Sequence, residues 1–353
     1  MTPLGQRIAA RIAQTGPVTI ADYMAECLLD PTHGYYATRD PLGAAGDFTT
    51  APEISQMFGE LLGLALAQAW LDRGAPAPFL LVEPGPGRGT LMTDMLRATR
   101  GVPGFHDAAR VHLIEASPTL REIQKKTLAH SVTHLDTIAG LPEGPLFLIA
   151  NEFFDALPIR QFQRAGGGWR ERVIGLHRDR LAFGLAGPSA PPDLAHRLND
   201  TQDGDIVETC PQGTAIASTI GQRIAEQGGA AIVIDYGGWR SKGDTFQAMK
   251  DHAHTDPLAE PGQADLTAHV DFEALAHAAH PAVASAMIPQ GVLLERLGIN
   301  TRAQQLAERL SGEKLDAHIA AHRRLTHAQE MGTLFKAMAL FQQDTPTPPG
   351  FEP

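Results

Sequence analysis

The sequence predicts a doubly wound α/β fold, in which helices cover both faces of a mostly parallel sheet. Four short apolar runs have the composition of strands buried on both faces: residues 79–82, 111–114, 146–149 and 231–234. Apolar residues recur at helical spacing over residues 90–100 and 117–128, between the first run and the third. Strands that alternate with helices in this way indicate crossover units and therefore a parallel sheet.

Other elements are predicted on both sides of these strands. Helical spacing predicts helices over residues 4–13, 21–29 and 53–71, the last preceded by a loop rich in glycine, proline and aromatic residues, 31–52. Apolar and polar residues alternate within 159–205, which predicts an inserted antiparallel β region.

The C-terminal part is less regular. The polar segment 240–267 has little pattern and is interpreted as a functional loop, because it is too long for an ordinary connection. Helices are predicted over residues 302–310 and 315–326, and residues 345–353 are expected to be a frayed tail.

The composition is that of a folded protein. Hydrophobic residues make up 43% and charged residues 20% of the 353 residues, which fits neither a disordered nor a fibrous chain. Lys and Arg number 29 against 40 Asp and Glu, so the net charge is 29 − 40 = −11. That sign repels a phosphate backbone and suits a cationic substrate, so no nucleic-acid partner is expected. The most apolar stretch, residues 61–70, is too short for a membrane span, which needs roughly 20 apolar residues.

Cysteine and histidine placement argues against disulfides and metals. Cys27 and Cys210 are far apart and form no Cys-x-x-Cys pair, so a reducing, cytoplasmic location is expected. His252 and His254 precede Asp256, but no further ligand with suitable spacing accompanies them. No metal site is expected.

The sharpest local signal is a glycine-rich turn between the first predicted strand and the next helix. Its glycines, Gly85, Gly87 and Gly89, let the backbone bend and approach a ligand without a Cβ in the way. The dinucleotide fingerprint G-x-G-x-x-G would place its third glycine at position 90, which is Thr90. The observed G-x-G-x-G, with Glu83 two positions ahead, resembles the first motif of S-adenosylmethionine methyltransferases. The alternative is a plain strand-to-helix connection.

A second acidic residue supports the cofactor interpretation. Glu115 follows the predicted strand 111–114, where Rossmann-like sheets use a carboxylate to accept both ribose hydroxyls. Because this feature is independent of the glycine-rich turn, the two together favour cofactor binding over a plain turn.

A third signal follows the predicted strand 146–149. In methyltransferases of this architecture the end of this strand faces the transferable methyl group, so Asn151, Glu152 and Asp155 are candidates for binding the acceptor. A carboxylate accepts the paired N–H donors of a guanidinium and helps to align the attacking nitrogen. The alternative is that Asn151 or Asp155 caps the next helix.

At this level of detail the chain resembles the MidA family of class I methyltransferases. The similar segments are residues 34–36, 46–55, 83–91, 151–158, 256–259 and 264–267. The resemblance extends over about residues 21–340 and implies a seven-stranded core with a helical N-terminal extension. The family includes the mitochondrial complex I assembly-factor arginine methyltransferase, in which the activity is symmetric dimethylation of an arginine in a complex I subunit.

The motifs and the resemblance together give an expected set of site residues. Those expected to bind S-adenosylmethionine are Glu83, Gly85, Pro86, Gly87, Gly89, Thr90, Glu115, Ala116, Asn151, Gly46 and Phe48. Those expected to act in catalysis are Glu152, Asp155 and Asp47.

Two further segments leave alternatives open. Residues 46–55 are expected to cover the cofactor, the alternative being the start of a helix capped by Thr50 or Ser55. Residues 235–237 either line the acceptor pocket or form a turn.

The sequence departs from the family pattern at two places. Asn151 stands where the mitochondrial member has His, and a Trp expected near His134 is absent from the sequence. These departures concern acceptor choice and adenine packing.

The expected organisation has five parts. They are a helical extension with the cofactor-covering loop at 1–75, the first half of the core at 76–158, an inserted β lobe and helix at 159–228, the second half of the core with a substrate loop at 229–344, and a tail at 345–353. The expected function is methylation of a protein arginine, on a complex I subunit. Methylation of a small molecule or another side chain, and a noncatalytic cofactor-binding assembly factor, are the alternatives.

Overall fold

The computed structural model describes residues 1–38 and 50–352, and its chain divides into two compact units. The first, called the β-rich unit, comprises residues 1–48, 155–213 and 240–271. The second, called the core unit, comprises residues 49–154, 214–239 and 272–353. Each unit is therefore assembled from segments that are far apart in the sequence.

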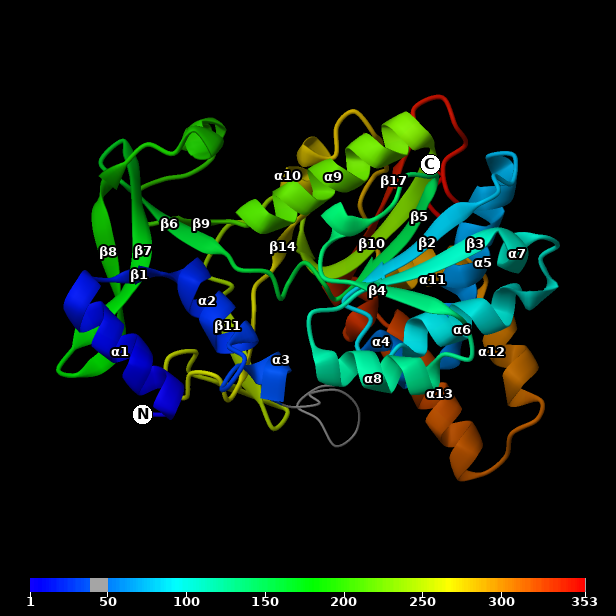
Figure 1. Ribbon diagram of the computed structural model, residues 1–353, viewed down its shortest axis with the longest axis horizontal. Coiled ribbons are helices and arrows are strands. Elements are labelled where there is room, and N and C mark those ends of the chain that lie inside the picture. Colours follow the sequence, from blue (N-terminus) through cyan, green and yellow to red (C-terminus); the bar gives the residue numbers. More distant parts are fainter. Residues whose placement is uncertain (39–49, 353) are drawn as a thin grey trace. The chain divides into compact units, whose positions relative to one another are not determined.

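The core unit contains the predicted doubly wound sheet, with the strand order β4-β3-β2-β5-β10-β17-β15 (Figure 1). The strands are β2 (Phe79–Pro84), β3 (Ala109–Ile114), β4 (Val132–Leu135), β5 (Leu146–Asn151), β10 (Gly229–Gly238), β15 (Val283–Ala284), β16 (Ile288–Pro289) and β17 (Phe335–Phe341). Neighbours from β4 to β10 are parallel, whereas β17 runs antiparallel to β10. Every residue of β2 and β5 is buried, which explains the continuous apolar runs 79–82 and 146–149 within these strands.

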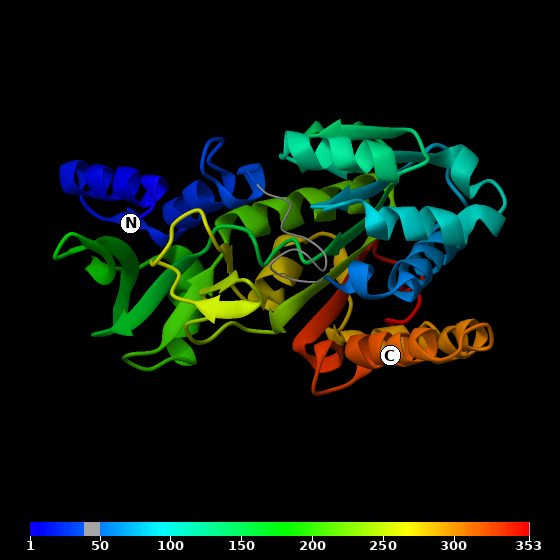
Figure 2. The same ribbon diagram turned by 90° about the horizontal axis from the view of Figure 1, so that it is seen from below.

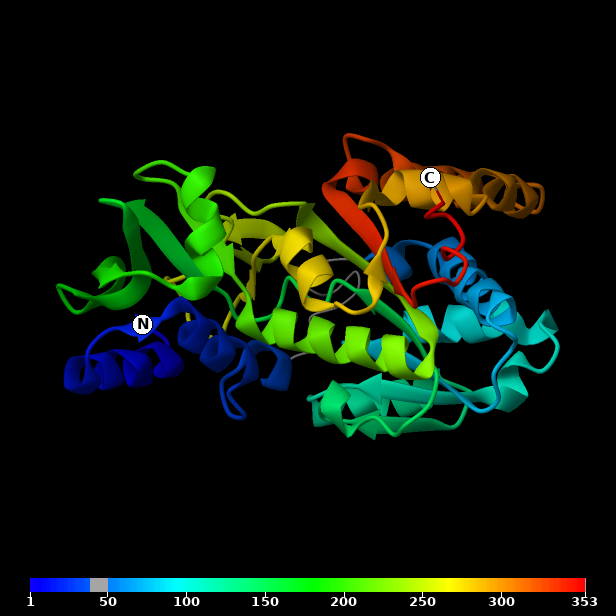
Figure 3. The same cartoon turned by 90° about the horizontal axis from the view of Figure 1, so that it is seen from above.

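Different helices cover the two faces of this sheet. α5 contacts α6, β5 and β10 on one face, and α9 runs along the other (Figures 2 and 3). The helices are α4 (Ala51–Ile54), α5 (Gln56–Asp72), α6 (Thr90–Ala98), α7 (Phe105–Ala108), α8 (Pro118–Thr127), α9 (Pro211–Gln227, of which 214–227 belong to this unit), α10 (Phe272–Ala278), α11 (Gln290–Arg296), α12 (Ile299–Ala307), α13 (Glu313–Thr326) and α14 (Met331–Leu334). Short 3₁₀ turns occupy Thr99–Gly101 and Ile138–Gly140.

The helix predicted over 53–71 is broken at Ser55. This residue is extended, with φ −159° and ψ 136°, and its Oγ accepts a hydrogen bond of 3.3 Å from the Met57 N–H. Ser55 therefore ends α4 and caps α5, whereas the Thr50 side chain makes no capping bond.

Two glycines of α5 bring it close to α6. A Cβ on Gly59 would lie 2.7 Å from the Asp94 Cβ, and one on Gly63 would lie 2.7 Å from the Met95 Cα. Because real side chains do not tolerate such distances, only glycine permits this packing.

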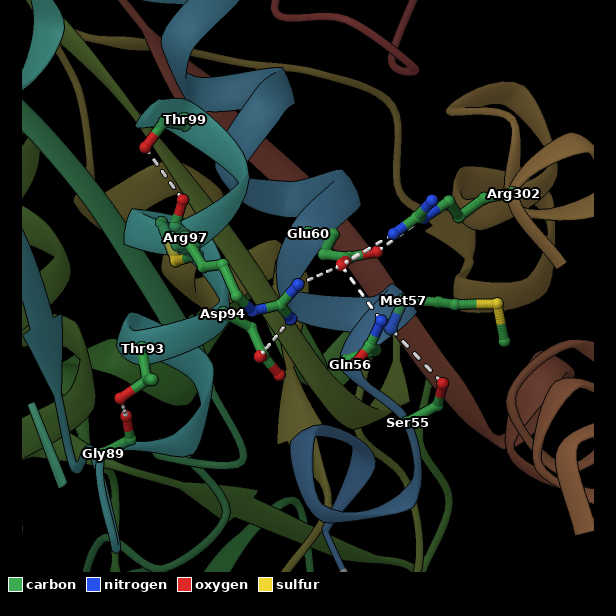
Figure 4. Close-up of polar contacts among 11 residues, drawn as sticks. Ser55, Gln56, Met57, Glu60, Gly89, Thr93, Asp94, Arg97, Thr99 and Arg302 are labelled. Atoms are coloured by element: carbon green, nitrogen blue, oxygen red, sulfur yellow. Dashed lines mark hydrogen bonds and ion pairs between the residues drawn. The ribbon is translucent and has the colours of Figure 1, made fainter. Parts of the chain in front are cut away.

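A buried carboxylate joins three helices of the core unit (Figure 4). Glu60 of α5 is 4% exposed and accepts hydrogen bonds from Arg97 of α6 at 2.5 Å and from the Arg302 Nε of α12 at 2.8 Å. Arg97 also pairs with Asp94 at 2.5 Å. Burial raises the pKa of Glu60, but the bonds from Arg302 and Arg97 outweigh it and hold that pKa below its ordinary value. Glu60 is therefore an ionised carboxylate that links the three helices through ion pairs.

The β-rich unit confirms the inserted antiparallel region. The order β1-β7-β6-β9, with β8 paired to β7, is antiparallel throughout. Its elements are α1 (Pro3–Thr15), β1 (Val18–Thr19), α2 (Ile20–Leu29), α3 (Tyr35–Thr38), β6 (Arg160–Ala165), β7 (Gly168–His177), β8 (Arg180–Ser189), a 3₁₀ turn (Pro192–Asn199), β9 (Ile206–Thr209), β11 (Gln247–Lys250), β12 (Ala253–Thr255), β13 (Asp265–Thr267) and β14 (Val270–Asp271). The segment 240–267, expected as a loop, thus contains the small sheet β12-β11-β13.

Residues 345–352 of the C-terminal tail pack against the core unit, so for them the expectation of a frayed end is wrong. Phe351 is 4% exposed and packs into the hydrophobic core of the core unit. Arg73 donates to the Pro346 carbonyl at 2.8 Å, and Arg296 donates to the Glu352 carbonyl at 2.9 Å. A buried ring and these bonds fix the tail against the unit.

Candidate cofactor and acceptor site

The candidate cofactor residues meet at one edge of the core sheet. Parallel pairing puts Pro84 of β2 opposite Ile114 of β3, and Asn151 of β5 opposite Ile234 of β10, so the carboxyl ends of these strands share an edge. The chain order reverses between β2 and β5. In open α/β sheets, ligands bind at the strand carboxyl ends beside such a reversal.

The glycine-rich turn is held in conformations that favour glycine. Gly85, Gly87 and Gly89 have φ values of +62°, +53° and +83°. A Cβ on Gly85 would lie 2.9 Å from Phe153 Cδ2, and one on Gly89 would lie 2.6 Å from Leu128 Cδ1. The positive φ values and these close approaches favour glycine at 85 and 89 whether or not a ligand binds.

Other parts of the turn hold its shape. The Pro86 carbonyl accepts the Gly89 N–H at 2.8 Å, and the Gly87 carbonyl accepts from Gln124 Nε2 at 2.7 Å. The Thr90 hydroxyl donates to Glu53 of α4 at 2.5 Å. Thr90, expected at the cofactor, thus also links α6 to α4.

Glu83 is a buried carboxyl at the end of β2. It is 3% exposed, and its Oε2 has no hydrogen-bond partner among the residues that the structure describes. Burial raises the pKa of Glu83 well above its ordinary value; a bond from the Met92 backbone lowers it, and the charge of Glu115 raises it further. Such a carboxyl is suited to receive a cationic donor.

Glu115 is held in place by its neighbours. Its Oε1 accepts the Ser117 N–H at 2.7 Å, and its Oε2 accepts from Gln124 Nε2 at 3.1 Å. Burial raises the pKa of Glu115 despite these bonds and a further one from the Ala116 backbone. Each carboxylate oxygen can accept more than one hydrogen bond, so the side chain keeps capacity for a ligand hydroxyl.

Asn151 and Glu152 lie at the end of β5. Asn151 Nδ2 donates to Glu152 Oε1 at 3.1 Å, whereas the buried Asn151 Oδ1 has no partner within the described part of the chain. The same Glu152 oxygen accepts the Ala51 N–H, the first of α4, at 3.0 Å. Glu152 also has φ +50°, an uncommon conformation for a residue other than glycine.

The turn after β5 is supported from β10. Asp235 is fully buried within β10, and its Oδ2 accepts the N–H groups of Phe153 and Phe154 at 3.2 and 3.0 Å. No helix follows this turn, because the next element along the described chain is β6. The helix-capping alternative for Asn151 and Asp155 is therefore wrong.

Asp155 belongs to the β-rich unit. It is 6% exposed, and its carbonyl accepts the Ala268 N–H at 3.0 Å. In the same unit the Tyr36 hydroxyl donates to Asp265 Oδ1 at 2.8 Å. Burial, followed by the charges of Asp265 and Asp155, raises the pKa of Tyr36, so these three groups lie within electrostatic reach of one another.

Three expected site residues, Gly46, Asp47 and Phe48, lie outside the described residues. Within the described ranges, no group of three His, Cys, Asp or Glu side chains has the geometry of a metal site. Within the same ranges, no helix is both long and apolar enough to cross a membrane.

Gln124 is a residue of this site that sequence reasoning missed. It contacts both the glycine-rich turn and Glu115, and it is fully buried on α8. Its sequence signal is a polar residue at a position of the predicted helix 117–128 where the helical spacing places the buried face.

Comparison with known proteins shows the family. A family model described as an S-adenosyl-L-methionine-dependent methyltransferase matches residues 61–289. The chain therefore belongs to this family of S-adenosylmethionine-dependent methyltransferases. The human protein arginine methyltransferase NDUFAF7, mitochondrial, is 40% identical over an alignment of 370 positions, gaps included, that covers 96% of this chain and 83% of the human protein. The NDUFAF7 homolog of Drosophila melanogaster is 35% identical over 96% of this chain and 84% of the fly protein.

Solved structures agree with this assignment. A crystal structure from Burkholderia thailandensis, bound to S-adenosyl-homocysteine, has a TM-score of 0.82 and 28% identity, covering 99% of this chain and 92% of that one. The family resemblance, the class I fold and the S-adenosylmethionine cofactor are thus confirmed. The expected cytoplasmic location is wrong, because the curated relatives are mitochondrial proteins.

Replacing Glu115 is expected to weaken cofactor binding. A hydrogen bond to a charged acceptor contributes about 1.5–3 kcal/mol, so Glu115→Ala should raise the dissociation constant by roughly tenfold to a hundredfold. Calorimetry with S-adenosylhomocysteine measures this dissociation constant. NAD serves as a second ligand, which we expect not to bind. The matched control is Glu122→Ala, which removes an exposed carboxylate on the neighbouring helix α8. Glu122 forms an ion pair with the exposed Lys125, so this variant should bind S-adenosylhomocysteine normally. An unchanged dissociation constant for Glu115→Ala would remove this residue from the site.

Cofactor binding is expected to weaken in acid because of Glu83. Its raised pKa means that the carboxyl is protonated below that pKa and ionised above it, and an ammonium group favours the ionised form. Affinity should therefore fall as the pH falls through the raised pKa, and binding near that pKa should release a proton. Calorimetry in two buffers of different ionisation enthalpy measures the release, and Glu83→Gln should abolish it. Affinity without pH dependence in the wild type would contradict this role.

Proposed function

We propose that this chain is a protein arginine N-methyltransferase whose substrate is a subunit of respiratory complex I. The observation that carries the proposal is the 40% identity, over 96% of the chain, to human protein arginine methyltransferase NDUFAF7. The resemblance to the MidA family, with its complex I assembly factor, supports the choice of substrate. The net charge of −11 suits a cationic acceptor.

The cofactor residues are proposed from the chemistry of the buried groups. When bound, S-adenosylmethionine supplies a methyl group on a sulfonium, which already carries its leaving group. Glu83 and Asn151 have buried oxygens without a partner in the described chain, and the ammonium group of the cofactor would satisfy them. Glu115 would accept the ribose hydroxyls, and the turn from Gly85 to Gly89 would pass beside the methionine portion.

The work left to the acceptor residues is binding and alignment. An arginine stays protonated in water, so the enzyme must bind its delocalised charge and favour attack by one nitrogen. We assign this to Glu152 and Asp155, with Asp47 as a third candidate. The φ of +50° at Glu152 supports a functional role, because backbone strain clusters at active sites.

Labelled methyl transfer tests the proposal. The protein and labelled S-adenosylmethionine are added to lysate of a strain that lacks this gene, and labelled products are identified by mass spectrometry. We expect label in a methylarginine of a complex I subunit. Label in a small molecule or in another side chain would replace the proposed acceptor, and cofactor binding without any transfer would indicate a noncatalytic assembly factor.

A further inference from the structure

Gln124 is a buried glutamine whose hydrogen-bonding groups are all used at the cofactor edge. It is 0% exposed, although glutamine is usually found at the surface. Its Nε2 donates to the Gly87 carbonyl at 2.7 Å and to Glu115 Oε2 at 3.1 Å. Its Oε1 lies 2.9 Å from His134 Nε2. One side chain thus joins the glycine-rich turn, the end of β3 and the strand β4.

The partners fix the orientation of this amide. Two acceptors, a carbonyl and a carboxylate, face one end, so that end must be the NH₂ group. The other end then presents an oxygen to His134, which donates from Nε2 in its neutral form. Burial, with the charges of Arg121 and Lys125, lowers the pKa of His134 and favours that neutral form.

Removing the amide would leave the two acceptors facing each other without a donor. The Gly87 carbonyl oxygen carries a partial negative charge and the ionised Glu115 carboxylate a full one, and they share one NH₂ group. Without it they repel, and the buried Glu115 loses a bond that stabilises its ionised form. Both groups would then leave the positions in which they meet a ligand.

We propose that Gln124 is a positioning residue of the cofactor site, which sets the Glu115 carboxylate and the Gly87 turn for the nucleoside. The inference rests on the cofactor roles proposed for Glu115 and Gly87 and is independent of the identity of the methyl acceptor. Gln124 acts through these two residues, so its contribution to binding depends on them.

A double-mutant cycle with S-adenosylhomocysteine tests this role. Gln124→Met keeps the shape of the side chain and removes its hydrogen bonds, and calorimetry should show binding at least about tenfold weaker. In a Glu115→Gln background the same change should cost clearly less, at most about threefold. An unchanged affinity of Gln124→Met, or the same factor in both backgrounds, would overturn the inference.

A matched control separates this role from a general loss of stability. Gln290 is also a fully buried glutamine of the core unit, and its Nε2 donates to the Leu325 carbonyl at 3.0 Å. Gln290→Met should lower the melting temperature and leave the affinity unchanged. If it weakens binding as much as Gln124→Met does, the effect of Gln124 is structural and the inference fails.

A second variant keeps the test decisive if Gln124→Met does not fold. His134→Leu removes the brace on Gln124 Oε1 at a half-buried position, and we expect about threefold weaker binding. Normal affinity in this variant would overturn the inference. Absence of binding by the wild-type protein would instead contradict the methyltransferase assignment itself.

Discussion

Gly87→Val is expected to abolish the binding of S-adenosylmethionine, with an affinity loss of at least about a hundredfold. Gly87 has φ +53°, which a β-branched residue adopts only with strain of order 1–3 kcal/mol. A backbone forced to adapt there would also disturb the Gly87 carbonyl, which accepts from Gln124. Calorimetry and ligand-induced thermal stabilisation measure the effect.

A second glycine provides the control for Gly87. Gly74 has φ +80°, and a Cβ there would meet no atom within 4 Å. Gly74→Val therefore carries the cost of the unfavourable conformation without any change near the cofactor, and it should bind normally when folded. If Gly87→Val binds as well as Gly74→Val does, the turn is only a strand-to-helix connection.

Glu152→Gln is expected to reduce methyl transfer at least about 30-fold while cofactor binding stays near normal. Glu152 is half-buried, and each hydrogen bond to a charged group contributes about 1.5–3 kcal/mol, where about 1.4 kcal/mol is a factor of ten. The glutamine oxygen can still accept from Ala51 and Asn151, whose bonds to Glu152 are 3.0 and 3.1 Å, so α4 keeps its anchor. The variant thus removes charge while conserving shape.

Single-turnover transfer from prebound cofactor measures the Glu152 effect, alongside cofactor affinity. Asp155→Asn should reduce transfer more weakly than Glu152→Gln. Wild-type transfer by Glu152→Gln would make its carboxylate an anchor for α4 alone. The acceptor would then have to be bound elsewhere, with Asp47 or Asp265 as the next candidates. Asp235 is a poor one, because its carboxylate already holds Phe153 and Phe154.

The central strands could be predicted from sequence because both of their faces are buried. Runs such as 146–149 are then continuously apolar, and their order with the helices indicates a parallel sheet. β4 was missed because three of its four residues are only half-buried and the other is exposed, which leaves no apolar run. β17 was missed because Phe335–Phe341 contains Lys, Ala and Met, which are not typical of strands.

The candidate site was predictable where the signal is local. Glu83, the glycines and Glu115 stand at strand ends, and parallel pairing alone brings strand ends together. Other contacts join residues that are far apart in the sequence. Ala51 and Glu152 are 101 residues apart, and Gln124 is 37 residues from Gly87 and 9 from Glu115. No local sequence pattern specifies such partners. The positive φ of Glu152 is imposed by its surroundings, since glutamate has no preference for that conformation.

The most direct test of the proposed cofactor site is a crystal structure of this chain with S-adenosylhomocysteine. We expect the amino end of the ligand within hydrogen-bond distance of Glu83 and both ribose hydroxyls on Glu115. Its sulfur should face the end of β5 at Glu152. A ligand bound at another edge of the sheet, or a ribose that does not contact Glu115, would contradict the proposed site.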